Sequence, residues 1–113
     1  MHELAVAERL VALVAEEATR AACVKVETVV LRLGVLSHVE PSSLEFAFLA
    51  ASRGTIAEGA ELRVERSVAQ AQCLSCAAKI TVTQRGLPCP CCRSFELVVV
   101  SGDELRLVRL EVL

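Results

Sequence analysis

Four of the six cysteines form two closely spaced pairs, and their chemistry is that of a metal site. Cys73 and Cys76 make the first C-x-x-C pair, and Cys89 and Cys92 make the second. A C-x-x-C turn presents two thiolates on one short loop, so two facing turns complete the four tetrahedral ligands that zinc prefers. Such a site leaves no open position for a substrate, and we therefore predict a structural Zn(II) site.

The same thiols allow other assignments. A redox dithiol is one, although the sequence lacks the βα context that activates such a pair. Iron would fit the same four-thiolate cage. Cys91 could replace Cys92 as a ligand, but the C-x-x-C spacing favours Cys92. Cys23 stands alone after the first predicted helix, where we expect it to be a small buried apolar residue.

The first three residues could bind a second metal. The α-amine of Met1, the amide nitrogen of His2 and the His2 imidazole can close fused chelate rings around one ion. A deprotonated amide in this set favours the square-planar metals Ni(II) and Cu(II). In the alternative interpretation His2 is a solvated terminal residue, and Glu3 is an acidic residue that complements the helix dipole. These residues alone do not decide between the two.

Composition excludes several classes of function. The chain has 113 residues, a net charge of −2 and three Phe but no Trp or Tyr, so it lacks the basic run and the stacking residues of a nucleic-acid binder. No stretch approaches the ~20 apolar residues of a membrane span, and the N-terminal segment is too acidic for a signal peptide. We therefore expect a cytoplasmic protein. The cytoplasm is reducing, so closely spaced cysteine pairs there indicate metal binding. The sequence shows no nucleophile paired with a general base and no phosphate-binding loop, so we do not expect an enzyme.

The surrounding pattern predicts an α+β fold that positions these residues. The predicted order is helix 4–21, strand 24–34, helix 41–52, strand 61–68, the cysteine-rich segment, and strand sequence over 95–100 and 104–113. The first helix should bury Val6, Leu10, Leu13, Val14, Ala18 and Ala21, and the second Leu44, Ala47, Phe48 and Ala51. In the first strand, Val29, Leu31 and Leu33 alternate toward one face.

These elements predict a small three-stranded sheet with two helices on one face, plus an inserted zinc-ribbon module. We assign residues 1–70 and 97–113 to the α+β domain with the N-terminal candidate metal site, and residues 71–96 to the zinc-binding ribbon. The ribbon holds few large apolar residues, so it needs a metal to fold.

Several motifs in order along the chain resemble those of the HypA/HybF family of hydrogenase nickel-incorporation proteins. They are MHEL at the N-terminus, LRLGVLSHVEP, FAF, GTIAEGAEL, CxxC, CPxC and SGDEL. The N-terminal MHE and the CxxC and CPxC pair are the specific ones, and the resemblance covers essentially the whole chain.

This resemblance implies a cytosolic, non-enzymatic metallochaperone that delivers Ni(II) to the large subunit of [NiFe]-hydrogenase. It implies the nickel-handling GTPase HypB as a partner and, in some bacteria, urease accessory proteins, with no nucleic acid or membrane involved. The nickel site would include His2 and Glu3, and the four paired cysteines would hold zinc. His38 is a candidate extra ligand or partner contact. A zinc-ribbon module that binds protein or nucleic acid, with an inert N-terminus, is the alternative.

The chain departs from the family pattern at four positions. Arg93 and Ala77 follow the two cysteine pairs where the family commonly has Gly, so we expect strained turns there. Cys91 fills a position that is ordinarily not cysteine. Val35 replaces an acidic residue, so any role of that acid in nickel or partner binding is lost.

Overall fold

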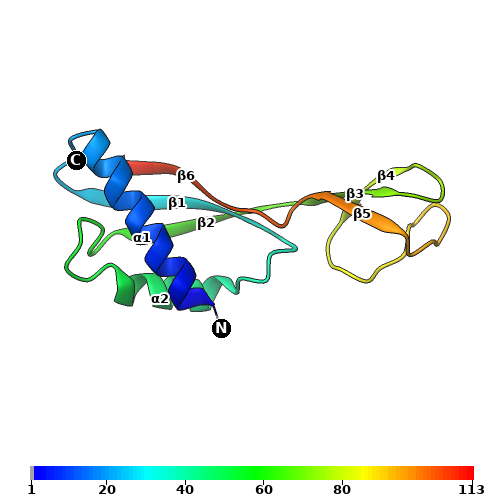
Figure 1. The fold of residues 1–113 in the computed structure, drawn as a ribbon, viewed down its shortest axis with the longest axis horizontal. Helices are drawn as coiled ribbons and strands as arrows, with labels where there is room; N and C mark the ends of the chain where they lie inside the picture. Colours follow the sequence, from blue (N-terminus) through cyan, green and yellow to red (C-terminus); the bar gives the residue numbers. More distant parts are fainter. Residues whose placement is uncertain (1) are drawn as a thin grey trace. The chain divides into compact units, whose positions relative to one another are not determined.

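The computed structural model describes residues 2–113 (Figure 1). Met1, one of the predicted nickel ligands, lies outside the described residues. The elements are α1 (Glu3–Arg20), β1 (Val26–Gly34), α2 (Pro41–Ala51), β2 (Glu61–Ser67), β3 (Ala69–Cys73), β4 (Lys79–Val82), β5 (Leu97–Ser101) and β6 (Leu105–Val112). The predicted α+β class is confirmed. No described helix is both long enough and apolar enough to cross a bilayer.

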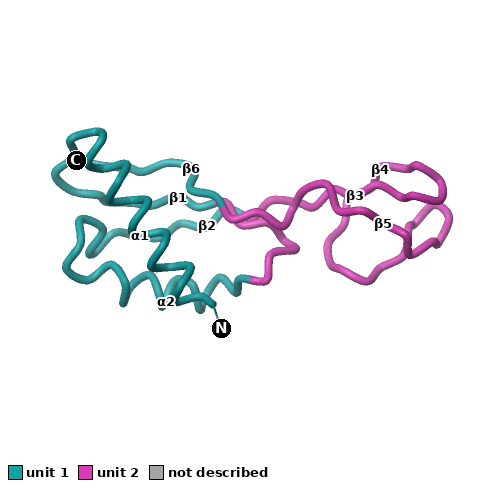
Figure 2. Tube along the Cα trace, in the orientation of Figure 1, with its two compact units in different colours: residues 1–31, 39–65, 106–113 teal, residues 32–38, 66–105 magenta. Residues whose placement is uncertain are grey.

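The chain divides into two compact units (Figure 2). The first comprises residues 1–31, 39–65 and 106–113, and the second comprises residues 32–38 and 66–105. The second unit includes the predicted ribbon 71–96 together with the segments on both sides of it. This extension has a simple cause, because β3 and β5, which flank the cysteine turns, pair with each other.

One three-stranded sheet has the order β2-β1-β6, with β1 in the centre. Val29 and Leu31 are fully buried, as the alternation in this strand predicts. Val30, which has the opposite parity, is fully buried too. Both faces of β1 are therefore covered at this point, and the alternation describes only half of its burial.

The two helices pack against each other in the first unit (Figure 1). The predicted buried face of α2 is confirmed at Leu44, Ala47 and Phe48, whereas Ala51 is only half-buried. The prediction for α1 is wrong at Leu13, which is 43% exposed, and at Ala21, which is exposed and caps the end of the helix. Val6 is only half-buried. The buried stripe of α1 consists of Glu3, Ala7, Leu10, Val11, Val14 and Ala18. These positions follow an i, i+3, i+4, i+7 repeat whose centre is displaced from the predicted one, so that Ala7 and Val11 face the core in place of Val6 and Leu13.

The second sheet has the order β4-β3-β5 and is antiparallel. Its buried cluster is small and consists of Leu36, Ala69, Ala71 and Val82. Two of these four side chains are single methyl groups, so the cluster removes little apolar surface from water. The weak core agrees with the expectation that this part of the chain needs a metal.

Candidate metal centre

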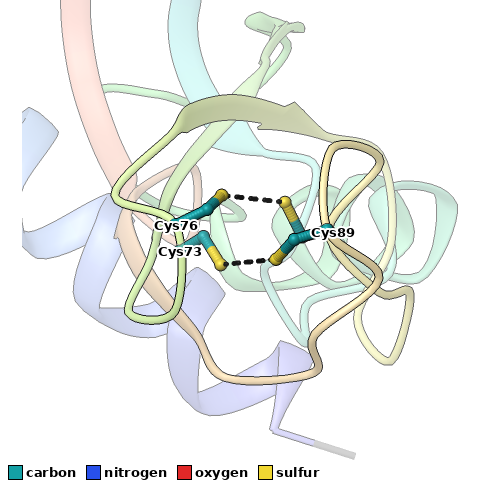
Figure 3. A group of neighbouring side chains, drawn as sticks. Cys73, Cys76 and Cys89 are labelled. Carbon is teal, nitrogen blue, oxygen red and sulfur yellow. Dashed lines mark hydrogen bonds between the residues drawn. The ribbon is translucent and has the colours of Figure 1, made fainter.

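The four paired cysteines converge in the second unit (Figure 3). Their sulfur atoms all lie within 4.8 Å of one another. The Sγ atoms of Cys73 and Cys92 are 3.6 Å apart, and those of Cys76 and Cys89 are 3.7 Å apart. Zn–S bonds of about 2.3 Å in a tetrahedron require S···S separations of about 3.8 Å. The cluster therefore fits a zinc ion in both ligand type and spacing.

Each pair lies on a tight turn that we call the first cysteine turn (residues 73–77) and the second cysteine turn (residues 89–93). The N–H of Ala77 donates to the Cys73 carbonyl at 2.9 Å, and the N–H of Arg93 donates to the Cys89 carbonyl at 2.8 Å. The turns close with φ of +63° at Ala77 and +67° at Arg93. Glycine adopts these angles most easily, so the predicted strain at these two residues is confirmed.

Backbone N–H groups favour ionisation of one thiol in each pair. The N–H groups of Cys92 and Cys91 lower the pKa of Cys89 to about 6, although burial opposes them. The N–H groups of Cys76 and Ser75 likewise lower the pKa of Cys73, again against burial. These two sulfurs are the buried members of the cluster.

The exposed member of the first pair behaves in the opposite way. The Ala78 N–H lowers the pKa of Cys76, but desolvation of its sulfur, which is partly buried against Cys89, and the neighbouring thiols of Cys92 and Cys73 outweigh it and raise the pKa to about 12. The metal-free cluster therefore does not carry four thiolates at neutral pH. A divalent cation supplies the charge that would ionise all four.

Cys91 does not belong to the group that converges, whereas Cys92 does. The Cys91 thiol is exposed, and its backbone N–H donates to Cys89 Sγ at 3.4 Å. Cys23, expected to be buried, is only half-buried.

The N-terminal candidates lie in the first unit. His2 directly precedes α1, its carbonyl accepts from the Val6 N–H at 2.9 Å, and its exposed side chain makes no capping hydrogen bond to the helix. Glu3 is the first residue of α1 and is only 8% exposed. Its carboxylate accepts from the backbone N–H of Glu40 at 3.1 Å. Glu3 therefore fixes the start of α1 to the start of α2, as well as being a charge at a helix end.

Glu40, whose backbone contacts Glu3, is a residue that the sequence interpretation did not single out. It is the N-cap of α2, where Pro41 occupies the first turn as predicted. The Glu40 carboxylate accepts from the Ser42 hydroxyl at 2.6 Å and from the Ser43 N–H at 2.9 Å. The sequence Glu-Pro-Ser-Ser could have indicated this helix cap, but glutamate is an uncommon N-cap residue. The contact with Glu3 has no local sequence signal, because the two residues are 37 positions apart.

His38 is exposed in the turn after β1. Among residues 2–113, the four cysteines are the only group of three or more His, Cys, Asp or Glu side chains close enough to share an ion. Within the described part of the chain, His38 therefore belongs to no group of three or more potential ligands.

Comparison with known proteins identifies the family. A family profile described as "Hydrogenase/urease nickel incorporation, metallochaperone, hypA" matches residues 1–112. The chain is 42% identical to hydrogenase maturation factor HypA 2 of Bradyrhizobium diazoefficiens and 44% identical to HypA of Azotobacter chroococcum mcd 1, each over 112 residues that cover 99% of both chains.

Solved structures agree. The solution structure of the Ni metallochaperone HypA from Helicobacter pylori has a TM-score of 0.73 and 28% identity, and the match covers 100% of this chain and 98% of that one. The four-cysteine cluster described above fits the same family. The chain belongs to the HypA family of nickel metallochaperones for hydrogenase maturation.

Proposed function

We propose that this chain carries Ni(II) at its N-terminus and delivers it for the maturation of [NiFe]-hydrogenase. The nickel ligands are Met1, His2 and Glu3, and the structural Zn(II) is held by Cys73, Cys76, Cys89 and Cys92. The observation that supports the nickel site best is that the exposed His2 side chain stands directly before α1 and is not used to cap it. The chain itself acts as a carrier and catalyses no reaction.

The proposed mechanism is ligand exchange. Three nitrogen donors are available to a square-planar ion: the α-amine of Met1, the amide nitrogen of His2 and the imidazole of His2. Because the site has few protein ligands and the His2 side chain is exposed, an acceptor protein can replace the ligands one at a time. The ligand nitrogens must be deprotonated, so acid weakens nickel binding and releases the cargo. The closed four-thiolate site offers no such access, and its zinc stays in place.

The partners follow from the family resemblance. We propose that the GTPase HypB and the hydrogenase large subunit exchange nickel with this chain in the cytoplasm. Urease accessory proteins are further candidates, because the matching family profile names urease as well as hydrogenase.

Nickel titration of the His2→Ala variant tests the proposal, with His38→Ala as the matched control. We expect His2→Ala to weaken Ni(II) binding by at least about tenfold and His38→Ala to leave it unchanged. Extra residues placed before Met1 should have the effect of His2→Ala, because they remove the free α-amine. Zinc content, measured by elemental analysis, should stay the same in every variant.

Unchanged nickel binding in His2→Ala would contradict the N-terminal site and favour the alternative, a zinc-ribbon interaction module. A parallel loss of zinc would show that the two metal sites are not independent.

A further inference from the structure

Hydrogen bonds link the two cysteine turns on their exposed side. The Ser75 hydroxyl, in the first cysteine turn, donates to Ser94 Oγ at 2.8 Å and also lies 3.3 Å from Glu96 Oε1. The Glu96 N–H donates to Ser94 Oγ at 3.1 Å. We call these three residues the serine clamp. Ser94 directly follows the second cysteine turn, so the clamp joins two turns that are otherwise distant in sequence.

Backbone hydrogen bonds support the same connection. The Leu74 N–H donates to the Glu96 carbonyl at 2.9 Å, and the Cys89 N–H donates to the Ser94 carbonyl at 2.7 Å. Ser94 therefore contacts the second turn through its carbonyl and the first turn through its hydroxyl. Its side chain is the direct bridge between the turns.

The clamp lies next to the two exposed ligands. Cys73 and Cys89 are buried, whereas Cys76 and Cys92 are exposed. Ser75 precedes Cys76, and Ser94 is two residues after Cys92. Zinc leaves a closed four-thiolate site one sulfur at a time, and an exposed sulfur detaches most easily. A detached sulfur binds again before the ion escapes if its turn is held in place.

We propose that Ser75, Ser94 and Glu96 are positioning residues of the zinc site, which hold the two cysteine turns together and slow the loss of the metal. This inference rests on the proposed zinc site. It explains how a module with a small apolar cluster keeps its ion while the nickel cargo exchanges.

The rate of zinc transfer to excess 4-(2-pyridylazo)resorcinol, a coloured chelator, tests the proposal on the full zinc-loaded chain. The double variant Ser75→Ala and Ser94→Ala should release zinc about tenfold faster, because two hydrogen bonds across the turns are lost. Ser75→Thr, which retains a hydroxyl, should release zinc at the original rate. Glu96→Gln should stay within about twofold, since its acceptor oxygen and backbone N–H remain.

Thr81→Val is the matched control. The Thr81 hydroxyl accepts from Gln70 Nε2 at 3.3 Å on β3 and β4, away from the cysteine turns. An equal acceleration in Thr81→Val would overturn the proposal, because general loosening of the module would then explain the result. Unchanged release in the double variant would overturn it as well.

Two further measurements distinguish a failure of the serine clamp from a failure of the zinc assignment. Each variant should still bind one zinc ion per chain, and its helical circular dichroism should melt at the original temperature. If the purified parent chain bound no zinc, the zinc assignment would fail and the clamp with it. A large rate change in Glu96→Gln alone would show that charge near the sulfurs, and not the bridge between turns, controls release.

Discussion

At the scale of single residues, the two cysteine turns close with left-handed backbone at residues that do not favour it. Ala77 and Arg93 both have a side-chain Cβ at φ above +60°. The left-handed backbone conformation costs an L-residue with a Cβ roughly 1–2 kcal/mol, whereas glycine adopts it without this cost. The tight turns that bring the sulfurs together therefore carry strain that the metal must offset.

Replacing Arg93 or Ala77 by glycine should stabilise the zinc-loaded protein by about 1 kcal/mol each. Denaturant unfolding at fixed zinc concentration measures the effect. Ala78→Gly is the control, because Ala78 is adjacent but is not among the residues with positive φ. It should destabilise by about 0.5–1 kcal/mol through the added freedom of the unfolded chain. Destabilisation by Arg93→Gly or Ala77→Gly would contradict this account.

Glu40 gives the first unit a dependence on pH. The Ser42 hydroxyl and the Ser43 N–H hold the pKa of its carboxylate at about 2, against a usual value of 4.5. The folded pKa lies below the unfolded one, so the stabilisation is complete above pH 4.5 and is lost as the pH falls toward 2.

Thermal unfolding of the metal-free parent chain and of Glu40→Gln measures this contribution. The parent should be more stable by a few degrees at neutral pH, and the difference should disappear between pH 4.5 and pH 2. A difference that stays constant over this range would show that the charge of Glu40 does not stabilise α2.

At the scale of elements, two glycines let strands and turns approach closely in the second unit. A Cβ on Gly34 would collide with the carbonyl group of Gly102, and a Cβ on Gly102 would collide with Ala69. The Gly34 N–H also donates to the Glu104 carbonyl at 2.8 Å, and the Leu36 N–H donates to the Gly102 carbonyl at 2.8 Å. The backbones are thus fixed at a separation that excludes even a methyl group.

We expect Gly34→Ala to destabilise the protein by at least about 3 kcal/mol, because backbone atoms would have to move. Gly59→Ala is the control. Gly59 has a φ of +81° and no atom near its missing Cβ, so this change should cost only about 1 kcal/mol. Chemical denaturation compares the two, and equal losses would mean that steric exclusion at Gly34 is unimportant.

The sequence predicted elements with strong periodicity and missed the others. Both helices and the strands near residues 24–34, 61–68, 95–100 and 104–113 follow from their apolar spacing and from Pro41. The strand β3 was not predicted, because Ala-Gln-Ala-Gln-Cys has no β-branched residue and takes its conformation from its partners. The strand β4 was missed although Ile80, Thr81 and Val82 are β-branched, because it is only four residues long and lies inside the cysteine-rich segment. The C-x-x-C spacing indicated which sulfurs would converge. No local pattern could place Glu40 beside Glu3, since long-range contacts depend on how helices pack.

At the scale of the whole molecule, the two units differ in what holds them together. Leu10, Val14, Leu44 and Phe48 are almost completely buried in the first unit. The cluster of the second unit is half alanine. Zinc binding in small modules contributes roughly 10–16 kcal/mol to folding, which such a cluster cannot replace.

Removal of zinc by a chelator should therefore affect the second unit selectively. In hydrogen exchange, we expect the amides of β3 and β4 to lose their protection, whereas those of α1 and Val29 in β1 keep theirs. Loss of protection in both units would show that the first unit depends on the metal too.

The central position of β1 also bears on how the chain folds during synthesis. β1 pairs with β2 on one side and with β6 on the other. Between β1 and β6 lie residues 35–104, which include all four converging cysteines. One edge of β1 must therefore remain unpaired while the ribosome makes the entire second sheet, and an unpaired apolar edge attracts other chains. The His2 end of the molecule is synthesised first, but the sheet of its own unit is completed only after the cysteines have emerged.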